Sequence, residues 1–161
     1  MTIDLDPAVP TPWLSLEQQG IWRAFLGGTT VIMDHLDRDL RQHHGLSMSE
    51  YEILVRLSEA PNRSIRMADL AEALSHSRSR ITHTISRLEK AGIVERSHCS
   101  ADGRGVEAVL TDEGFTVLEA AAHTHVRGVH AYLIESASPE DLAAVGRVMS
   151  SITARLGGRD F

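Results

Sequence analysis

The stretch Ser64–Gly114, SIRMADLAEALSHSRSRITHTISRLEKAGIVERSHCSADGRGVEAVLTDEG, decides the fold of this chain. Apolar residues at helical spacing predict a short helix over residues 67–74, a tight turn at 75–77 and a second helix over 78–91. Gly92 is placed to end the second helix. The pattern therefore predicts two helices joined by a tight turn.

A β-hairpin is expected directly after Gly92. One strand begins at Ile93 and its partner runs from Val106 to Leu110, with the turn-rich SADGRG between them. Thr111 is then the N-cap of a further helix. Arg104, between two glycines at the tip, is suited to enter a narrow DNA minor groove, where the potential is most negative.

The helix over 78–91 has two different faces. Ile81, Ile85 and Leu88 are expected to point into a core. The opposite face is small, polar and basic, and comprises Ser79, His83, Ser86 and Lys90 with Thr82 and Arg87 at its edges. Such a face can approach phosphates closely and donate hydrogen bonds to base edges. This pattern favours DNA recognition.

Long helices flank this middle segment. After an extended arm over residues 1–14, a helix is expected from Leu16 to about His44, and Ser49 is expected to cap another over 50–59. A third begins after Thr111. In a last helix from Pro139, apolar residues repeat at spacings of three and four, namely Leu142, Val145, Met149, Ile152 and Leu156. These helices are expected to pack on a second copy of the chain; the alternative is an amphipathic helix on its own core.

Charge is distributed unevenly along the 161 residues. The net charge is −6, which by itself argues against nucleic acid. Residues 77–106 carry six basic and three acidic side chains, a local +3 that leaves −9 for the remainder. Because distant charges are screened within about 8 Å at physiological salt, the local field governs phosphate affinity. The acidic total is compatible with a DNA-binding segment.

Composition indicates a cytoplasmic location. The N-terminus has no basic and apolar signal segment, no stretch is long enough to span a membrane, and Cys99 is the single cysteine.

The run L-A-x-x-L-x-x-S-x-S-x-x-T-x-x-I-x-x-L-x-x-x-G-x-V-x-R, at Leu70–Arg96, is followed by D-x-R-G-x-x-x-x-L-T-x-x-G at Asp102–Gly114. This combination resembles the MarR-type winged helix-turn-helix regulators. Ser75 departs from the glycine that many relatives carry in the turn. The resemblance implies a mainly α fold with a small β-hairpin wing. It implies an arm over 1–14, a dimerisation region at 15–45 and 111–157, and a DNA-binding lobe at 46–110.

The resemblance also implies a function and a set of contact residues. A homodimer would place two recognition helices in successive major grooves of a pseudo-palindromic operator, about 34–36 Å apart. It would act as a sequence-specific regulator, a repressor released by a small ligand. Ser77, Arg78, Ser79, Thr82 and His83 would face bases or nearby phosphates, Arg80 and Arg87 would hold the backbone, and Arg104 would enter the minor groove.

Several alternatives remain open at this stage. A winged-helix module that binds protein without DNA is one, and an enzyme is disfavoured because no catalytic motif stands out. The resemblance further implies a small aromatic effector, which would bind near Trp22, His35 and Arg56. No cofactor is expected. A metal site is not expected either, since His123 and His125 lie two residues apart and point to opposite sides of a helix. The nine histidines could instead sense pH.

Overall fold

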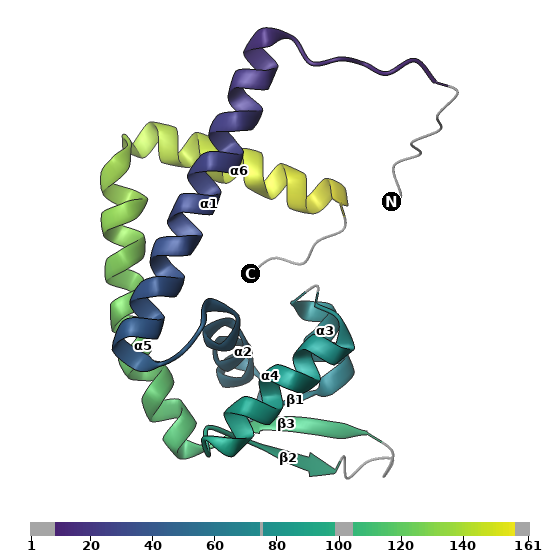
Figure 1. Cartoon of the computed structure of the whole chain (residues 1–161), viewed down its shortest axis with the longest axis vertical. Coiled ribbons are helices and arrows are strands. Elements are labelled where there is room, and N and C mark those ends of the chain that lie inside the picture. The colour runs from purple at the N-terminus through teal and green to yellow at the C-terminus, as the bar shows by residue number, and fades with distance from the viewer. Residues whose placement is uncertain (1–8, 75, 99–104, 157–161) are drawn as a thin grey trace. The chain divides into compact units, whose positions relative to one another are not determined.

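The structure is a computed structural model that describes residues 9–74, 76–98 and 105–156. The chain divides into two compact units, and the helices that connect them take part in both (Figure 1). Unit 1 comprises Met1–Asp34 and His130–Phe161, and unit 2 comprises His35–Val129. No helix among the described residues is long and apolar enough to cross a membrane.

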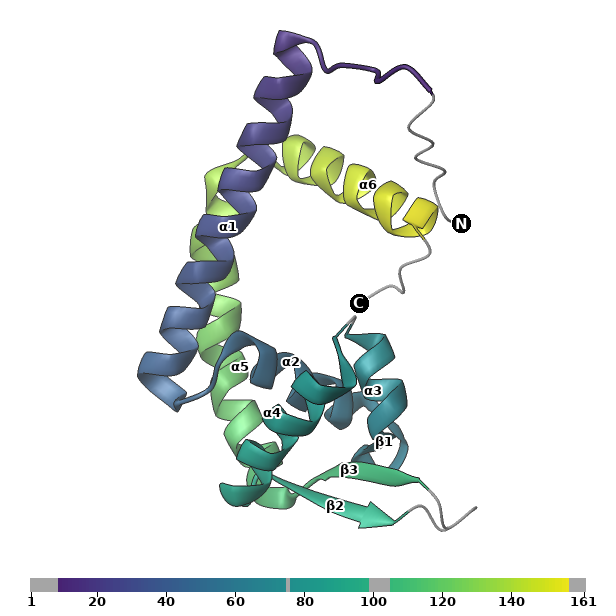
Figure 2. The ribbon, with the colours of Figure 1, turned by 45° about the vertical axis from the view of Figure 1, so that its right-hand side comes forward.

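The elements follow the predicted order, and the expectation of a mainly helical chain with a small β-sheet is confirmed (Figures 1 and 2). The α-helices are α1 (Leu16–His44), α2 (Met48–Glu59), α3 (Met67–Ala73), α4 (Arg78–Lys90), α5 (Asp112–Tyr132) and α6 (Pro139–Leu156). The strands are β1 (Ser64–Arg66), β2 (Val94–His98) and β3 (Val106–Leu110). Short 3-10 turns occur at Pro61–Arg63 and Ile134–Ser136.

The hairpin is part of a three-stranded antiparallel sheet with the order β1-β3-β2. In β2 and β3, Val94 pairs with Leu110 and His98 with Val106. On the other edge, Ser64 of β1 pairs with Val109. Strand β1 is not predicted by the sequence, because three residues are too few to show a period-2 pattern. This strand fixes the start of α3 against the sheet.

Unit 2 contains a continuous apolar core beneath α4. All residues predicted to face inward on α4 are buried, and they join buried side chains of α2, α3 and the sheet in one cluster. Ile81 and Ile85 are fully buried, as are Leu54 and Leu57 of α2. Burial of each such side chain contributes about 1.5–3 kcal/mol. The recognition helix of the predicted motif is therefore held rigidly by its inner face.

Gly92 ends α4 as the sequence predicts. Its φ of +73° lies in the left-handed region that glycine adopts without strain. The amide of Gly92 donates to the carbonyl of Glu89, and the amide of Ile93 donates to the carbonyl of Leu88. This pair of bonds is the Schellman arrangement. It turns the chain directly from α4 into β2.

The prediction that Ser49 caps α2 is wrong, and the cap is Ser47. The Ser47 hydroxyl accepts from the amide of Glu50, and the Glu50 carboxylate accepts from the amide of Ser47 at 2.8 Å. This reciprocal capping box satisfies two amide donors at once, whereas a cap at Ser49 satisfies none of them. The helix accordingly begins at Met48. The predicted cap at Thr111 is confirmed, because its hydroxyl accepts from the amide of Gly114 at 2.9 Å. The hydroxyls of Ser15 and Ser138 accept from the amides of Gln18 and Asp141 in the same way.

Unit 1 has a very different surface from unit 2. The α6 helix has no buried residue, and its predicted apolar stripe includes Val145, Met149, Ile152 and Leu156, each more than a third exposed. On the N-terminal part of α1, Trp22 is 51% exposed and stacks on Phe25 with ring centroids 5.9 Å apart. These helices carry apolar faces at helical spacing that the described residues of unit 1 leave open to solvent.

Gly114 is predicted to be intolerant of any side chain. A Cβ at this position would lie 2.0 Å from the carbonyl oxygen of Ile93, which also accepts a hydrogen bond from the amide of Thr111. Because this neighbour is backbone at the junction of β2, β3 and α5, Gly114→Ala is expected to cost about 2–3 kcal/mol of folding free energy.

Chemical denaturation of the purified variant measures this cost. Gly20→Ala is the matched control, since in the part of the chain that the structure describes nothing lies within 4 Å of a Cβ at this position of α1. It should be neutral or stabilising by up to about 1 kcal/mol. Equal stability losses in both variants would contradict the close-packing argument.

Candidate nucleic-acid interface

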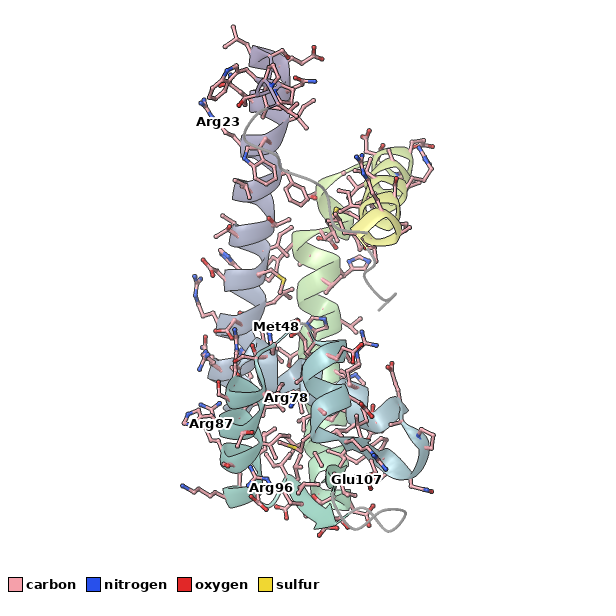
Figure 3. All side chains as sticks on the ribbon, turned by 90° about the vertical axis from the view of Figure 1, so that its right-hand side faces the viewer. Arg23, Met48, Arg78, Arg87, Arg96 and Glu107 are labelled. Atoms are coloured by element: carbon pink, nitrogen blue, oxygen red, sulfur yellow. The ribbon has the colours of Figure 1, made fainter. Side chains whose placement is uncertain are left out.

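Helix α4 presents a polar outer face above its buried inner face. Ser77 is its N-cap, and the Ser77 hydroxyl accepts from the amide of Arg80 at 3.3 Å. The exposed residues of the helix are Arg78, Ser79, Arg80, Thr82, His83, Arg87, Glu89 and Lys90. Figure 3 labels Arg78 and Arg87 on this helix. Basic and small polar groups predominate, and the single acid lies near the C-terminal end.

The hydroxyl groups of α4 are held against the helix backbone. Thr82 donates to the carbonyl of Arg78 at 2.8 Å, and Ser86 donates to the carbonyl of Thr82 at 2.9 Å. Their remaining lone pairs can accept hydrogen bonds, and the Thr82 methyl group supplies an apolar contact. This is the mixture of functions that reads base edges in a major groove.

Arg96 joins the hairpin to the recognition helix. Its Nη2 donates to the Ser86 hydroxyl at 2.7 Å and to the Thr82 carbonyl at 3.1 Å. Its Nη1 lies 3.5 Å from the carboxylate of Glu89. Figure 3 shows Arg96 on β2. Strand β2 and helix α4 are thereby linked by side-chain bonds as well as by Gly92.

Two arginines of α4 contact the start of α2. Nη2 of Arg80 donates to the Ser49 hydroxyl at 3.0 Å. Nε and Nη2 of Arg87 donate to the two carboxylate oxygens of Glu50. Both contacts secure the orientation of α4 relative to α2.

A polar depression lies beside these contacts, with a volume of about 290 Å³. Its lining comes from the end of α1, the start of α2 and the middle of α4: Asp37, Arg41, Ser47, Ser49, Glu50, Arg80, His83, Thr84 and Arg87. Asp37 accepts from the Met48 amide at 2.8 Å and from Nε of Arg41 at 2.6 Å. The bond from Arg41 is the main reason why the pKa of Asp37 lies below its ordinary value.

A second groove of about 310 Å³ runs between the start of α4, the start of α3 and the first residue of β3. Its lining includes Arg66 and Met67 at the start of α3, Arg78 and Thr82 of α4, and Gly105 beside β3. Arg78 and Thr82 of α4 line this groove, whereas Arg80, His83, Thr84 and Arg87 of the same helix line the first depression.

Comparison with known proteins identifies the family to which this arrangement belongs. The sequence model of the MarR family matches residues 46–106. The chain is 39% identical to Sco3205, a MarR family transcriptional regulator from Streptomyces coelicolor solved in complex with DNA, with 89% of this chain and 90% of that one aligned and a TM-score of 0.84. The chain belongs to the MarR family.

Two further members support this assignment. AbsC, a MarR family transcriptional regulator from Streptomyces coelicolor, is 40% identical over 92% of this chain and all of its own, with a TM-score of 0.85. The HTH-type transcriptional repressor YetL from Bacillus subtilis is 27% identical over 77% of this chain and 74% of its own length. These findings favour a DNA-binding transcriptional regulator over the alternative of a winged-helix module without DNA binding.

The structure brings most of the predicted contact residues of this MarR member onto one helix. Ser77, Arg78, Ser79, Arg80, Thr82, His83 and Arg87 lie on or beside α4. Arg104 lies outside the described residues, as do Ser75, Asp102 and Cys99. The DNA contacts of Arg104 and of the seven residues on or beside α4 stay predictions. Sequence reasoning missed Glu50, although the S-x-x-E motif of its capping box was a readable signal.

The predicted effector residues do not lie in one unit. Trp22 belongs to unit 1, whereas His35 and Arg56 belong to unit 2 and are both partly buried. The effector site therefore stays a prediction. Among the described residues there is no group of three or more His, Cys, Asp or Glu side chains arranged to hold a metal ion.

One histidine is placed in an unusual environment. The ring of His125 on α5 packs against Tyr51 of α2 with centroids 4.6 Å apart, and its buried Nδ1 has no hydrogen-bond partner among the described residues. Burial lowers the pKa of His125 below its ordinary value of 6.5. His44, whose Nε2 lies 2.8 Å from the Thr124 hydroxyl, also has a lowered pKa, chiefly through burial.

These shifts predict a loss of stability in mild acid. The folded pKa of His125 lies below the unfolded value, so the unfolded chain binds more protons as the pH falls through about 6.5. The contribution of neutral His125 to the free energy of unfolding is therefore fully present above that pH and is lost as the pH falls below it. Thermal melts between about pH 5.5 and 7.5 should show a falling midpoint as pH is lowered.

His125→Phe should weaken this pH dependence while keeping a ring against Tyr51, with a residual effect from His44. His123→Phe, at an exposed position on the same helix, is the matched control and should keep the full dependence. A wild-type midpoint that does not fall toward pH 5.5, or identical curves for His125→Phe and wild type, would contradict the argument.

Proposed function

We propose that this MarR family member is a dimeric, sequence-specific DNA-binding repressor that a small ligand releases from its operator. The observation that carries the proposal is helix α4, which is fixed by a buried inner face and presents a basic, hydrogen-bonding outer face. Sequence similarity adds to this support, because Sco3205 was solved with DNA bound.

In the proposed complex, the N-terminal half of α4 lies in the major groove. Arg78, Ser79, Thr82 and His83 reach base edges or nearby phosphates, with Ser77 at the start of the helix. The backbone is held by Arg80 and Arg87, and Arg104 enters the minor groove. Two copies would occupy half-sites about 34–36 Å apart.

Dimerisation is supported by the apolar surface of unit 1. Isolated apolar residues are normal on protein surfaces, but contiguous stripes usually mark an interface. The exposed stripe of α6 and the exposed aromatic pair Trp22 and Phe25 of α1 provide such surfaces. The dimerisation region is accordingly proposed at residues 15–45 and 111–157, with the DNA-binding lobe at 46–110.

Repression and ligand release are further parts of the proposal. YetL is named a repressor, and its similarity extends over three quarters of both chains. A small aromatic effector is proposed to bind near Trp22, His35 and Arg56, which combine an indole, an imidazole and a guanidinium. Action on an operator implies the cytoplasm as the location.

Selection of binding sites from random double-stranded DNA tests the function. The purified chain is expected to enrich a pseudo-palindrome whose half-sites are separated by about one helical turn. A matched pool of scrambled duplexes at the same salt concentration measures non-specific binding. Enrichment of no sequence would contradict sequence-specific binding, and enrichment of a single half-site would contradict the dimeric mode.

Truncation before Pro139 tests the proposed dimer surface. Removal of α6 takes away the exposed apolar stripe, so the shortened chain is expected to be monomeric by light scattering and to lose most of its operator affinity. Circular dichroism should show that the remaining helices are kept. A truncated chain that stays dimeric would place the interface elsewhere.

A further inference from the structure

The carboxylate of Glu50 lies at the junction between the start of α2 and the middle of α4. Glu50 is only 2% exposed. Among the described residues, it is the one charged residue that is buried. One carboxylate oxygen accepts from both the amide and the hydroxyl of Ser47 at 2.8 Å. Both oxygens also accept from Arg87.

Burial of this charge dictates how it must be bonded. A buried carboxylate without donors costs several kcal/mol, and paired charges remain buried only with good geometry and further hydrogen bonds. The donors of the capping box, the amide and the hydroxyl of Ser47, carry no charge. Arg87 supplies the opposite charge, and it does so through a paired contact that fixes the plane of its guanidinium group.

Arg87 is nevertheless half exposed. Its side chain has a relative exposure of 54%, while that of Glu50 has 2%. The pair uses Nε and Nη2 of a group with five N–H donors, so the Nη1 edge takes no part in it. One edge of the guanidinium is thus bound inside the protein, and another edge remains for a partner outside.

We propose that Glu50 is a positioning residue for DNA binding: it holds Arg87 in the orientation in which its outer edge binds a backbone phosphate. This inference rests on the proposed DNA-binding function and goes beyond it by assigning a role to a buried acid. An arginine held in its bound orientation loses less side-chain freedom on binding, so prior fixing strengthens the contact.

The direction in which DNA affinity changes when Glu50 is neutralised distinguishes this positioning role from simple charge repulsion. Loss of an acid near DNA should strengthen binding if long-range repulsion dominates. Loss of the acid that holds Arg87 should weaken it. Glu89→Gln serves as the matched charge control, because it removes an acid from α4 whose partner is Arg96 at 3.5 Å and leaves the Glu50–Arg87 pair intact.

The experiment compares Glu50→Gln, Arg87→Gln and the double variant, with operator affinity measured over a range of salt concentrations. Glutamine at position 50 keeps the shape and the capping-box acceptor, since this box takes Glu or Gln. Glu50→Gln is expected to weaken binding about five- to tenfold. Arg87→Gln is expected to lower the log–log salt slope by about 1, and Glu50→Gln should shift the slope toward that value.

The double variant gives the decisive comparison. If Glu50 acts through Arg87, then Glu50→Gln has no further effect on affinity or slope in the Arg87→Gln background. Glu89→Gln should bind as well as wild type or better. Thermal melts check that each variant is folded. Glu50→Asp, which keeps the charge, should have an affinity between those of wild type and Glu50→Gln.

Three results would overturn the proposal. The first is tighter DNA binding by Glu50→Gln, and the second is an additive loss of affinity in the double variant. The third is a loss of affinity by Glu50→Gln with an unchanged salt slope, because a merely structural role produces that result. If the wild-type chain binds no duplex selectively, the proposed function itself fails. That result is separate from a failure of the Glu50 inference, which requires wild-type binding.

Discussion

The buried carboxylate of Glu50 imposes the strictest constraint on unit 2. Apolar side chains in a core tolerate many arrangements, but a buried charge requires specific donors at specific places. Ser47 and Arg87 supply them from two different helices. The start of α2 and the rotation of α4 are therefore fixed by the same group. Displacement of either helix leaves a charge in the core without compensation, so the orientation of α4 is tied to the integrity of the capping box.

The electrostatics of the site follow from local placement of charge within an acidic chain. The net charge is −6, yet the outer face of α4 is predominantly basic. The acids near this face are committed to partners, since Asp37 contacts Arg41, Glu50 contacts Arg87 and Glu89 contacts Arg96. Each pair leaves part of its guanidinium at the surface. The face thus keeps exposed hydrogen-bond donors, while the rest of the chain carries the net negative charge.

The fold was predictable wherever a signal was local in sequence. The inward residues Ile81, Ile85 and Leu88 follow from helical spacing, and the end of α4 follows from Gly92. Strand β1 could not be predicted, since it exists only by pairing with β3 far along the chain. The choice of Ser47 over Ser49 depended on recognising its partner three residues later. The Glu50–Arg87 pair joins residues 37 positions apart, and no pattern in either segment reveals it.

The two units differ in what holds them together, and this difference bears on how the protein works. Unit 2 buries its own core, so its recognition helix is formed before any partner arrives. The α6 helix of unit 1 buries none of its residues. In the proposed dimer, association would cover the exposed apolar stripe and at the same time supply a second recognition helix. A single helix makes few phosphate contacts, whereas two helices of fixed spacing add their contacts and require a matched operator. In the proposed dimer, the apolar faces of α1 and α6 would therefore contribute to DNA specificity without touching a base.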